Sequence, residues 1–380
     1  MSKIKQKFSL KAIKNKEIID NIRWKGLKEI RVLISAIGHP TTPGVVESVK
    51  NNEEREVKVI GVDMNPSVII KNVLDGFYQV PTYSDPELSD PYYIDSILKI
   101  CKKEKIDVYY AQQEEEGIFS SKRKQEFEDL GIKVIRPASH EILEISNNKR
   151  KFHELFKKEN IPHSNFRVIN EFNELEEKIL ELGYPTKNVF LKPAVSVGGR
   201  GAVLVSEDIA YHKFERGESS PKYNLKTIKE MFSKIDQKNF PELIAMEYLT
   251  GEYFSVDVLS KKGDIIYSVP KKRIKGNASN TTIGQIELNE KVLEQAKKAC
   301  EIFSFSFLQN YEMKMNENEE PMIYDINPRG GASLAFCKAA GVNLMYYAIK
   351  MALGEEFPRD NKIKNNLKMI RGFHEYYENF

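Results

Sequence analysis

Residues 312–331 read Glu-Met-Lys-Met-Asn-Glu-Asn-Glu-Glu-Pro-Met-Ile-Tyr-Asp-Ile-Asn-Pro-Arg-Gly-Gly. This stretch predicts two short strands, 308–315 and 321–326, that are joined by a polar turn. Asp325 and Asn327 are two residues apart, so they point to the same side of an extended chain. Glu312 lies on the partner strand and can face them. Three oxygen-bearing side chains on one wall suit a hard cation such as Mg²⁺.

Arg329 comes two residues after Asn327 in the sequence. Its planar guanidinium can bind two phosphate oxygens at once. Gly330 and Gly331 allow backbone N–H groups to come close to a ligand. A cation site, a phosphate-binding arginine and an open backbone in one loop favour phosphoryl chemistry. The alternative interpretation is a polar hairpin that ends in a Pro-Arg-Gly-Gly turn.

A second informative stretch is Val189-Phe-Leu-Lys-Pro-Ala-Val-Ser-Val-Gly-Gly-Arg-Gly-Ala-Val-Leu-Val205. Two strands flank a loop of small residues, whose backbone N–H groups can surround phosphate oxygens. Lys192 stands at the base of the loop and can supply a cation. A plain hairpin with a glycine turn remains the alternative. The loop is not of the Walker type, because it lacks Gly-Lys-Ser/Thr and a strand follows it.

The N-terminal part shows the pattern of a parallel α/β domain. Residues 29–37 are an apolar, β-branched run that predicts a buried strand. A glycine loop, a helix at 45–51 and a strand at 57–62 follow, which is a βαβ pattern. The fingerprint Gly-x-Gly-x-x-Gly is absent, so we expect no NAD site. Helices at 120–130 and 290–303, strands at 106–111 and 265–269, and a final strand at 368–377 complete the outline.

Composition excludes several classes of protein. The 380 residues are 41% hydrophobic and 30% charged, with a net charge of +3. This charge gives no reason to expect a nucleic-acid or membrane partner, and no apolar run reaches the roughly 18 residues of a membrane span. The three cysteines, Cys101, Cys300 and Cys337, form no ligand pair. They fit a reducing cytoplasm better than a zinc site or a disulfide framework.

Taken together, these stretches resemble the ATP-grasp superfamily, in particular its carboxylate–amine ligases and carbamoyl-phosphate-synthase-like members. The resemblance covers about residues 30–375. It rests on motifs in the family's order: Asn148-Lys149, Phe190-Leu191-Lys192-Pro193, Ser196 to Gly201, Met246-Glu247-Tyr248-Leu249 with Gly251-Glu252, Arg273, Asn310-Tyr311-Glu312 and Asp325-x-Asn327-Pro328-Arg329. Two departures are Asp325, where the family more often has Glu, and Asn148, where it has Asp.

The resemblance implies an α/β fold in two parts. After an extension at 1–27, a parallel Rossmann-like α/β domain is expected at 28–140. A two-part ATP-grasp nucleotide domain would occupy 141–380, with a mobile lid at about 187–247.

The resemblance also implies a reaction, in which ATP phosphorylates a carboxylate to give an acyl phosphate and ADP. An amine then attacks the acyl phosphate and releases inorganic phosphate. Glu312, Asp325 and Asn327 would hold Mg²⁺ or Mn²⁺, and Arg273 and Arg329 would stabilise the transferring phosphoryl group. The implied nucleotide-binding residues are Lys149, Lys192, Ser196, Gly198, Gly199, Gly201, Glu247, Tyr248, Leu249 and Glu252. The expected partners are a small-molecule carboxylate and an amine, with an amino acid preferred on the resemblance alone.

Several alternatives stay open. The enzyme could use bicarbonate or carbamate or transfer phosphate, and a non-catalytic ATP-binding regulator is a lesser alternative. The Met-Lys-Met around Lys314 resembles a biotinylation motif, but Lys314 is expected within a strand. A homodimer is only the default for such folds. The candidates for contact with the acceptor substrate are His39, Gln113, Glu114, Gly330, Gly331 and Ser333.

Overall fold

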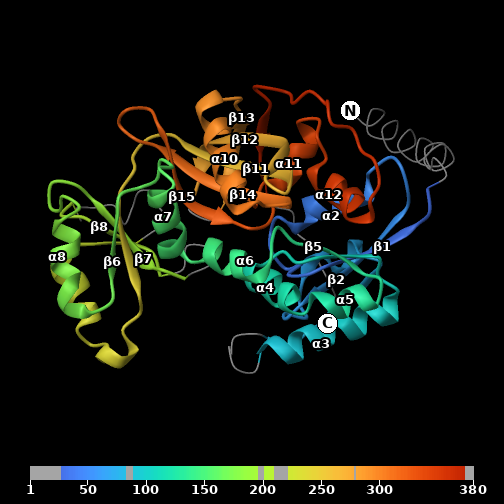
Figure 1. The fold of residues 1–380 in the computed structure, drawn as a ribbon, viewed down its shortest axis with the longest axis horizontal. Helices are drawn as coiled ribbons and strands as arrows, with labels where there is room; N and C mark the ends of the chain where they lie inside the picture. The colour runs from blue at the N-terminus through green and yellow to red at the C-terminus, as the bar shows by residue number, and fades with distance from the viewer. Residues whose placement is uncertain (1–26, 83–88, 196–200, 209–220, 278–279, 373–380) are drawn as a thin grey trace, which may run out of the picture. The chain divides into compact units, whose positions relative to one another are not determined.

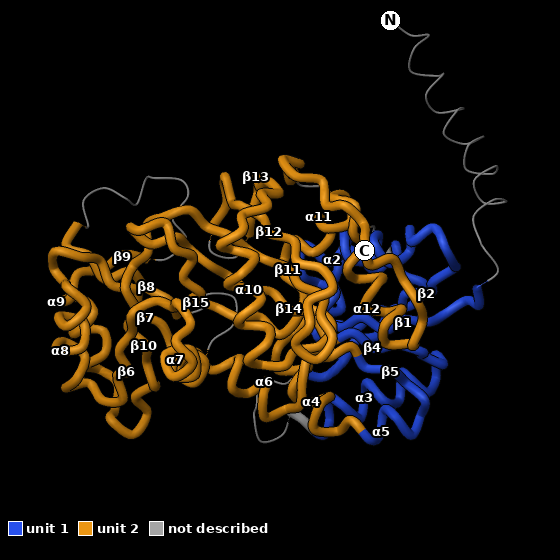
Figure 2. Tube along the Cα trace, turned by 45° about the horizontal axis from the view of Figure 1, so that its top comes forward, with its two compact units in different colours: residues 1–110, 125–134 blue, residues 111–124, 135–380 orange. Residues whose placement is uncertain are grey.

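The computed structural model describes residues 27–82, 89–195, 201–208, 221–277 and 280–372. The chain divides into two compact units, which Figure 2 shows in different colours. Unit 1 comprises residues 1–110 and 125–134, and unit 2 comprises residues 111–124 and 135–380. The domain limits expected from the sequence stay a prediction. None of the helices in the described ranges combines the length and the hydrophobicity that crossing a membrane requires.

Unit 1 contains a sheet in the order β3-β2-β1-β4-β5. Its β1–β2, β1–β4 and β2–β3 pairs are all parallel. The elements are β1 (Ile30–Ile34), α2 (Thr42–Lys50), β2 (Val57–Asp63), the 3-10 helix η1 (Ile69–Val73), β3 (Gly76–Gln79), α3 (Ser89–Glu104), β4 (Val108–Tyr110), α5 (Lys124–Asp129) and β5 (Lys133–Ile135). The predicted parallel α/β fold of this part of the chain is therefore confirmed.

The apolar run at residues 29–37 forms the central strand of this sheet. Val32, Leu33 and Ile34 are all fully buried. Successive side chains of a strand point to opposite faces, so both faces of β1 are covered. The sequence did not predict β3, whose Gly-Phe-Tyr-Gln is too short and too polar to show a strand period.

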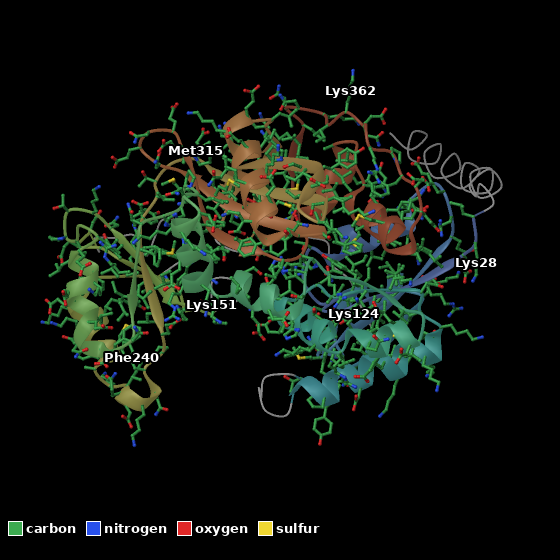
Figure 3. The ribbon with its side chains drawn as sticks, viewed as in Figure 1. Lys28, Lys124, Lys151, Phe240, Met315 and Lys362 are labelled. Carbon is green, nitrogen blue, oxygen red and sulfur yellow. The ribbon has the colours of Figure 1, made fainter. Side chains whose placement is uncertain are left out.

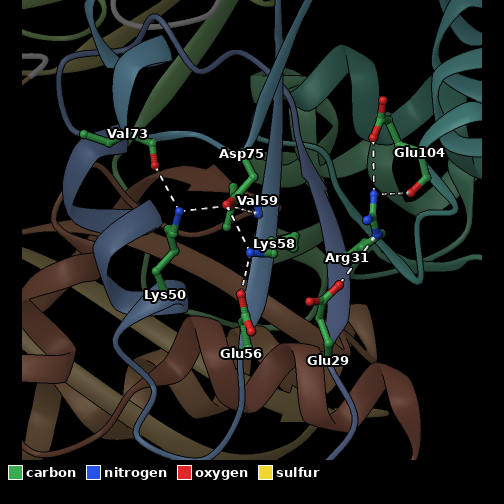
Figure 4. Close-up of polar contacts among 9 residues, drawn as sticks. All are labelled: Glu29, Arg31, Lys50, Glu56, Lys58, Val59, Val73, Asp75 and Glu104. Atoms are coloured by element: carbon green, nitrogen blue, oxygen red, sulfur yellow. Dashed lines mark hydrogen bonds and ion pairs between the residues drawn. The ribbon is translucent and has the colours of Figure 1, made fainter. Parts of the chain in front are cut away.

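Polar contacts tie strands β1 and β2 of unit 1 to residues of the neighbouring helices and of the segment before β3, as Figure 4 shows. Asp75 accepts hydrogen bonds from Lys50 Nζ at 2.9 Å and from the backbone N–H of Val59 at 2.8 Å. Arg31 pairs with Glu104 at 3.3 Å. These partly exposed ion pairs contribute little stability, so the sheet depends mainly on its apolar strands.

Unit 2 contains two further sheets. One has the order β6-β10-β7-β8-β9, and the other has the order β15-β14-β11-β12-β13-β16. The helices are α4 (Glu114–Lys122), α6 (His140–Asn147), α7 (Lys149–Lys158), η2 (Phe172–Glu174), α8 (Leu175–Leu180), α9 (Leu225–Phe232), η4 (Gln237–Asn239), α10 (Glu290–Phe303), α11 (Leu334–Ala339) and α12 (Leu344–Leu353). The strands are β6 (Phe166–Ile169), β7 (Val189–Pro193), β8 (Val203–Val205), β9 (Lys222–Tyr223), β10 (Leu243–Glu247), β11 (Tyr253–Lys261), β12 (Asp264–Gly276), β13 (Thr281–Ile286), β14 (Phe307–Met315), β15 (Pro321–Asn327) and β16 (Lys368–Ile370).

The sheet that begins with β6 has its own hydrophobic core. Leu175 and Ile179 of α8 pack on it together with Ile228 of α9. Phe240, labelled in Figure 3, lies against the same core, and its ring is 5.7 Å from that of Phe232. The expected lid, 187–247, includes four of these strands.

The sheet that contains β14 and β15 has a second core, against which α10 packs (Figure 1). Val292, Ala296 and Ala299 occur at helical spacing on the buried side of α10. The predicted helix at 290–303 has the observed bounds. Its end is set by Ser304, which adopts the left-handed conformation typical of a helix C-cap.

The strand expected at 265–269 is longer than predicted. The basic stretch at 270–275 was expected to follow the strand, but β12 continues to Gly276 because it pairs with β11 on one side and β13 on the other. Arg273 therefore lies within a strand rather than in a loop after one. The final strand is described at Lys368–Ile370, and residues 373–377 of the expected strand lie outside the described residues.

Candidate functional site

The hairpin of β14 and β15 brings Glu312 and Asp325 together. The two residues are direct cross-strand partners, and Asn310 pairs with Asn327 in the same register. Directly opposite residues of antiparallel strands project on the same side of the sheet. The prediction that Glu312 and Asp325 project from one face of the sheet is confirmed, and this face is called the carboxylate wall below.

The same hairpin contains a β-bulge. The register shifts between Glu312 and Met313, so that Met313 pairs with Ile323 and Tyr324 is left as the extra residue. The Tyr324 hydroxyl donates a hydrogen bond to Glu312 Oε2 at 3.0 Å. No residue pattern predicts this bulge, because bulges depend on the pairing of two strands.

Lys149 approaches the carboxylate wall from helix α7. Its Nζ is 3.6 Å from Asp325 Oδ1, and its side chain is 5% exposed. Asn148 caps this helix by accepting a hydrogen bond from Lys151 N at 3.0 Å. Since Asn and Asp cap helices about equally well, the departure from the family's Asp leaves this helix start intact.

Lys192 reaches the same wall from strand β7. Its buried ammonium group donates a hydrogen bond to the backbone oxygen of Tyr324 at 3.3 Å. Burial lowers the pKa of Lys192 to about 8; Asp325 and Glu312 act against this shift, and Lys149 adds to it. Two lysines and two carboxylates therefore share one electrostatic environment.

Two arginines also affect the pKa of Glu312. Burial and the charge of Asp325 raise the pKa of Glu312, whereas Arg273, the Tyr324 hydroxyl and Arg329 lower it. Arg273 lies with its guanidinium carbon 3.5 Å from the centre of the Tyr253 ring. This stacking and a hydrogen bond from its Nε to Thr281 Oγ1 at 3.0 Å hold the guanidinium in place.

Arg329 is held by several partners. Its NH2 group is 2.7 Å from Glu114 Oε1 and donates to Asn327 Oδ1 at 3.1 Å. Its NH1 group donates to the backbone oxygen of Gly330 at 3.0 Å. Glu114, in the first turn of α4, has a side chain that is only 4% exposed. Glu114, one of the candidates for contact with the acceptor substrate, therefore lies against the arginine rather than in open solvent.

A buried ion pair lies beneath the loop that follows Arg329. Asp257 and Lys271 form this pair, and the backbone N–H of Gly331 donates to Asp257 Oδ1 at 2.7 Å. A Cβ on Gly331 would be 2.6 Å from Asn310 Nδ2, so only glycine fits there. Sequence reasoning missed Asp257, although a lone carboxylate between Val256 and Val258 is unusual enough to have been noticed.

Arg371, which the sequence left without a role, contacts the same loop. It donates to the backbone oxygen of Ala332 at 2.6 Å and to that of Thr281 at 3.1 Å. Burial lowers the pKa of Arg371, and the charge of Asp257 opposes the shift. The residues from 329 to 332 are thus held from two sides.

The last residue of β10 and the segment between β10 and β11 carry the residues expected to contact adenine and ribose. Glu247 accepts hydrogen bonds from Asn165 N at 2.9 Å and Asn165 Nδ2 at 3.1 Å. Glu252 pairs with Lys272. Lys314 Nζ donates to the backbone oxygen of Leu249 at 2.9 Å, and it lies 4.9 Å from the centre of the Tyr248 ring.

Lys314 is therefore engaged within the fold. It is a residue of β14 and is partly buried, whereas a biotinylated lysine must project from an exposed turn. This placement argues against the biotin interpretation.

The other candidates are distributed as follows. Gly201 has a positive φ of 73°, and a Cβ there would lie 3.1 Å from Pro193 Cγ. Ser196, Gly198 and Gly199 lie outside the described residues. Gln113 and Ser333 occupy the N-caps of α4 and α11, and His39 Nδ1 is 2.8 Å from Thr41 Oγ1 within unit 1.

The donor set at the wall fits a hard divalent cation. The available oxygen ligands are the two facing carboxylates of Glu312 and Asp325 and the side-chain amide of Asn327. Burial and the neighbouring charge of Asp325 raise the pKa of Glu312, and a cation bound between the two carboxylates would offset that repulsion. Within the described ranges, no group of three or more His, Cys, Asp or Glu side chains forms a cation site. A cation here would complete its coordination with other oxygens.

Two family models match the chain. One, described as ATP-grasp in the biosynthetic pathway with Ter operon, matches residues 239–372. The other, described as a PylC-like N-terminal domain, matches residues 32–135.

One similar curated protein is the carbamoyl phosphate synthase large chain of Clostridium acetobutylicum. It is 22% identical over 293 residues, which is 71% of this chain and 25% of the relative. The chain thus spans about a quarter of the length of the carbamoyl phosphate synthase large chains that it matches.

Solved structures share the fold. The N5-carboxyaminoimidazole synthetase of Staphylococcus aureus, in complex with ADP, aligns with a TM-score of 0.63 and 17% identity, over 89% of this chain and 81% of that one. An L-amino acid ligase of Bacillus licheniformis aligns with a TM-score of 0.60 and 15% identity, over 86% and 74%. Together with the motifs and the family model over residues 239–372, these similarities place the chain in the ATP-grasp superfamily.

Proposed function

We propose that the protein is an ADP-forming ligase that activates a small-molecule carboxylate as an acyl phosphate and couples it to an amine. The observation that carries the proposal is the convergence of opposite charges on one wall of unit 2. Glu312 and Asp325 supply negative charge, and Lys149 and Lys192 supply positive charge beside it. Transfer of a phosphoryl group depends mainly on positioning and charge neutralisation, which such a set provides.

Each group has a role in this proposal. Lys149 and Lys192 would neutralise the phosphates of ATP. Arg273 and Arg329 would stabilise the transferring phosphoryl group and the acyl phosphate. A magnesium ion held by Glu312, Asp325 and Asn327 would neutralise charge on the β- and γ-phosphates when bound.

The nucleotide base and the phosphate loop have proposed contacts too. The segment Glu247-Tyr248-Leu249 and Glu252 would contact adenine and ribose. Ser196, Gly198, Gly199 and Gly201 would contact phosphate and exclude water from the acyl phosphate. Glu247 already accepts two hydrogen bonds from Asn165, so it would contact the base through any remaining acceptor capacity of its two oxygens.

An amino acid is the proposed carboxylate. The support is the structural similarity to a protein named L-amino acid ligase. A second candidate uses bicarbonate in place of the organic acid, and it is favoured by the sequence similarity to carbamoyl phosphate synthase.

The test is ADP release with ATP, Mg²⁺ and a two-dimensional panel of amino acids and amines. The ligase requires that ADP release depends on both an acid and an amine. ADP release with bicarbonate and no organic acid would favour the second candidate. Nucleotide binding without turnover on either panel would contradict both and leave a regulatory ATP-binding role.

A further inference from the structure

We propose that Tyr324 is a positioning residue for Glu312, whose hydroxyl holds one carboxylate oxygen and leaves the other to bind the divalent cation. The inference rests on the proposed function, because it requires Glu312 to bind a cation together with the nucleotide. It is specific to this chain's own hairpin, whose bulge places the tyrosine beside the carboxylate.

The bulge explains why a tyrosine can reach this place. In a regular strand Tyr324 and Asp325 would project on opposite sides of the sheet. The register breaks here, since Asp325 pairs with Glu312 but Ile323 pairs with Met313. A bulge bends the strand and redirects the side chain of the extra residue. The Tyr324 hydroxyl consequently lies 3.0 Å from Glu312 Oε2, on the side of the carboxylate wall.

The hydrogen bond restricts how Glu312 can coordinate a cation. A carboxylate that accepts a hydrogen bond on one oxygen is fixed in orientation and presents its other oxygen to a cation. Asp325 is shorter than the glutamate that the family more often has, so it reaches less far from its strand. A glutamate held in one orientation opposite a short aspartate would keep the distance between the two ligands constant.

The same residue also contacts the lysine of the other sheet. The backbone oxygen of Tyr324 accepts a hydrogen bond from Lys192 Nζ at 3.3 Å, and that Nζ lies 5.7 Å from the centre of the Tyr324 ring. Tyr324 therefore links a proposed cation ligand to a proposed phosphate ligand. Replacing its hydroxyl alone leaves the carbonyl contact with Lys192 in place, which allows the two contributions to be separated.

The test uses Tyr324→Phe in the full chain and measures ADP affinity by titration calorimetry, once with Mg²⁺ and once with EDTA. The ratio of the two affinities is the gain due to the cation. We expect this gain to fall about tenfold in the variant, which is the usual effect of removing a hydrogen bond to a metal ligand. The affinity in EDTA should stay at the wild-type value, and Mn²⁺ should reproduce the Mg²⁺ result.

The matched control is Tyr311→Phe. Tyr311 neighbours Glu312 on β14, but it is fully buried in the hydrophobic core on the other side of the sheet. The control removes a tyrosine hydroxyl from the strand that carries Glu312 and should leave both affinities unchanged.

The outcomes are distinct. A Tyr324→Phe protein with the wild-type gain from Mg²⁺ would overturn the positioning role and leave the proposed function standing. An equal loss of affinity with and without the cation would also overturn it, because the hydroxyl would then serve general structure. If the wild-type protein binds ADP equally tightly with Mg²⁺ and with EDTA, both the positioning role and the proposed cation site are overturned.

Discussion

Replacing Arg329 by alanine should damage both stability and activity, and a second change can separate the two. Arg329 pairs at 2.7 Å with Glu114, whose side chain is 4% exposed. Its removal leaves a buried carboxylate without its counter-charge. Breaking a buried ion pair from one side costs about 3 kcal/mol or more. For a unit of this size, that loss lowers the melting temperature by roughly 6 °C.

The double variant Arg329→Ala with Glu114→Gln removes the stranded charge as well. We expect it to regain about 2 kcal/mol, because a neutral amide costs far less to bury than an unpaired carboxylate. Activity should not return with stability. Loss of a group that stabilises charge in the transition state lowers kcat about 100-fold or more, and both variants should show this loss.

The assays are thermal unfolding followed by circular dichroism and ADP release under saturating ATP and Mg²⁺. Glu114→Gln alone reports the effect of weakening the pair while keeping the arginine. If the single and double variants melt at the same temperature, Glu114 does not carry a buried charge that depends on Arg329. If the double variant regains normal kcat, Arg329 has no role in the chemistry.

Three further predictions concern Lys192, Gly251 and the buried pair of Asp257 and Lys271. The affinity for ADP should fall about tenfold between pH 7 and pH 9, because Lys192, with a pKa of about 8, loses its positive charge over that range. Titrations of the Lys192→Arg variant with ADP at both pH values should show no such decline, because arginine stays charged. Gly251→Ala should lower the free energy of unfolding by about 2 kcal/mol in urea titrations, because a Cβ would lie 2.3 Å from the backbone oxygen of Met315; a wild-type midpoint would contradict this close packing. Lys271→Met should destabilise the protein by about 3 kcal/mol or more, since Asp257 would remain buried and charged; unchanged thermal unfolding would show that the pair contributes nothing.

Local sequence patterns predicted much of the fold. Two short runs joined by a polar turn predicted the strands at 308–315 and 321–326, and helical spacing of apolar residues predicted the helix at 290–303. These patterns succeed because burial of one face imposes a period on the sequence. They fail where an element is short, as for β3, or where pairing on both sides extends a strand through a proline, as for β12.

The facing of Glu312 and Asp325 could also be expected from the sequence. Both residues lie in one hairpin, where the register of two neighbouring strands determines which side chains meet. That hairpin, however, contains a bulge that no residue pattern predicted. Tyr324 therefore emerged as a neighbour of Glu312 only from the structure.

What the sequence by itself determined is the order of the charged motifs and the sheets that carry them, because residue type and spacing record local backbone geometry and burial. Only the tertiary structure decided the partners of those charges: Arg329 with Glu114, Asp257 with Lys271, and Lys149 with Asp325. The physical reason is that an ion pair between distant segments leaves no periodic trace in either of them. Its strength depends on the loss of water around both groups, which only the folded chain brings about.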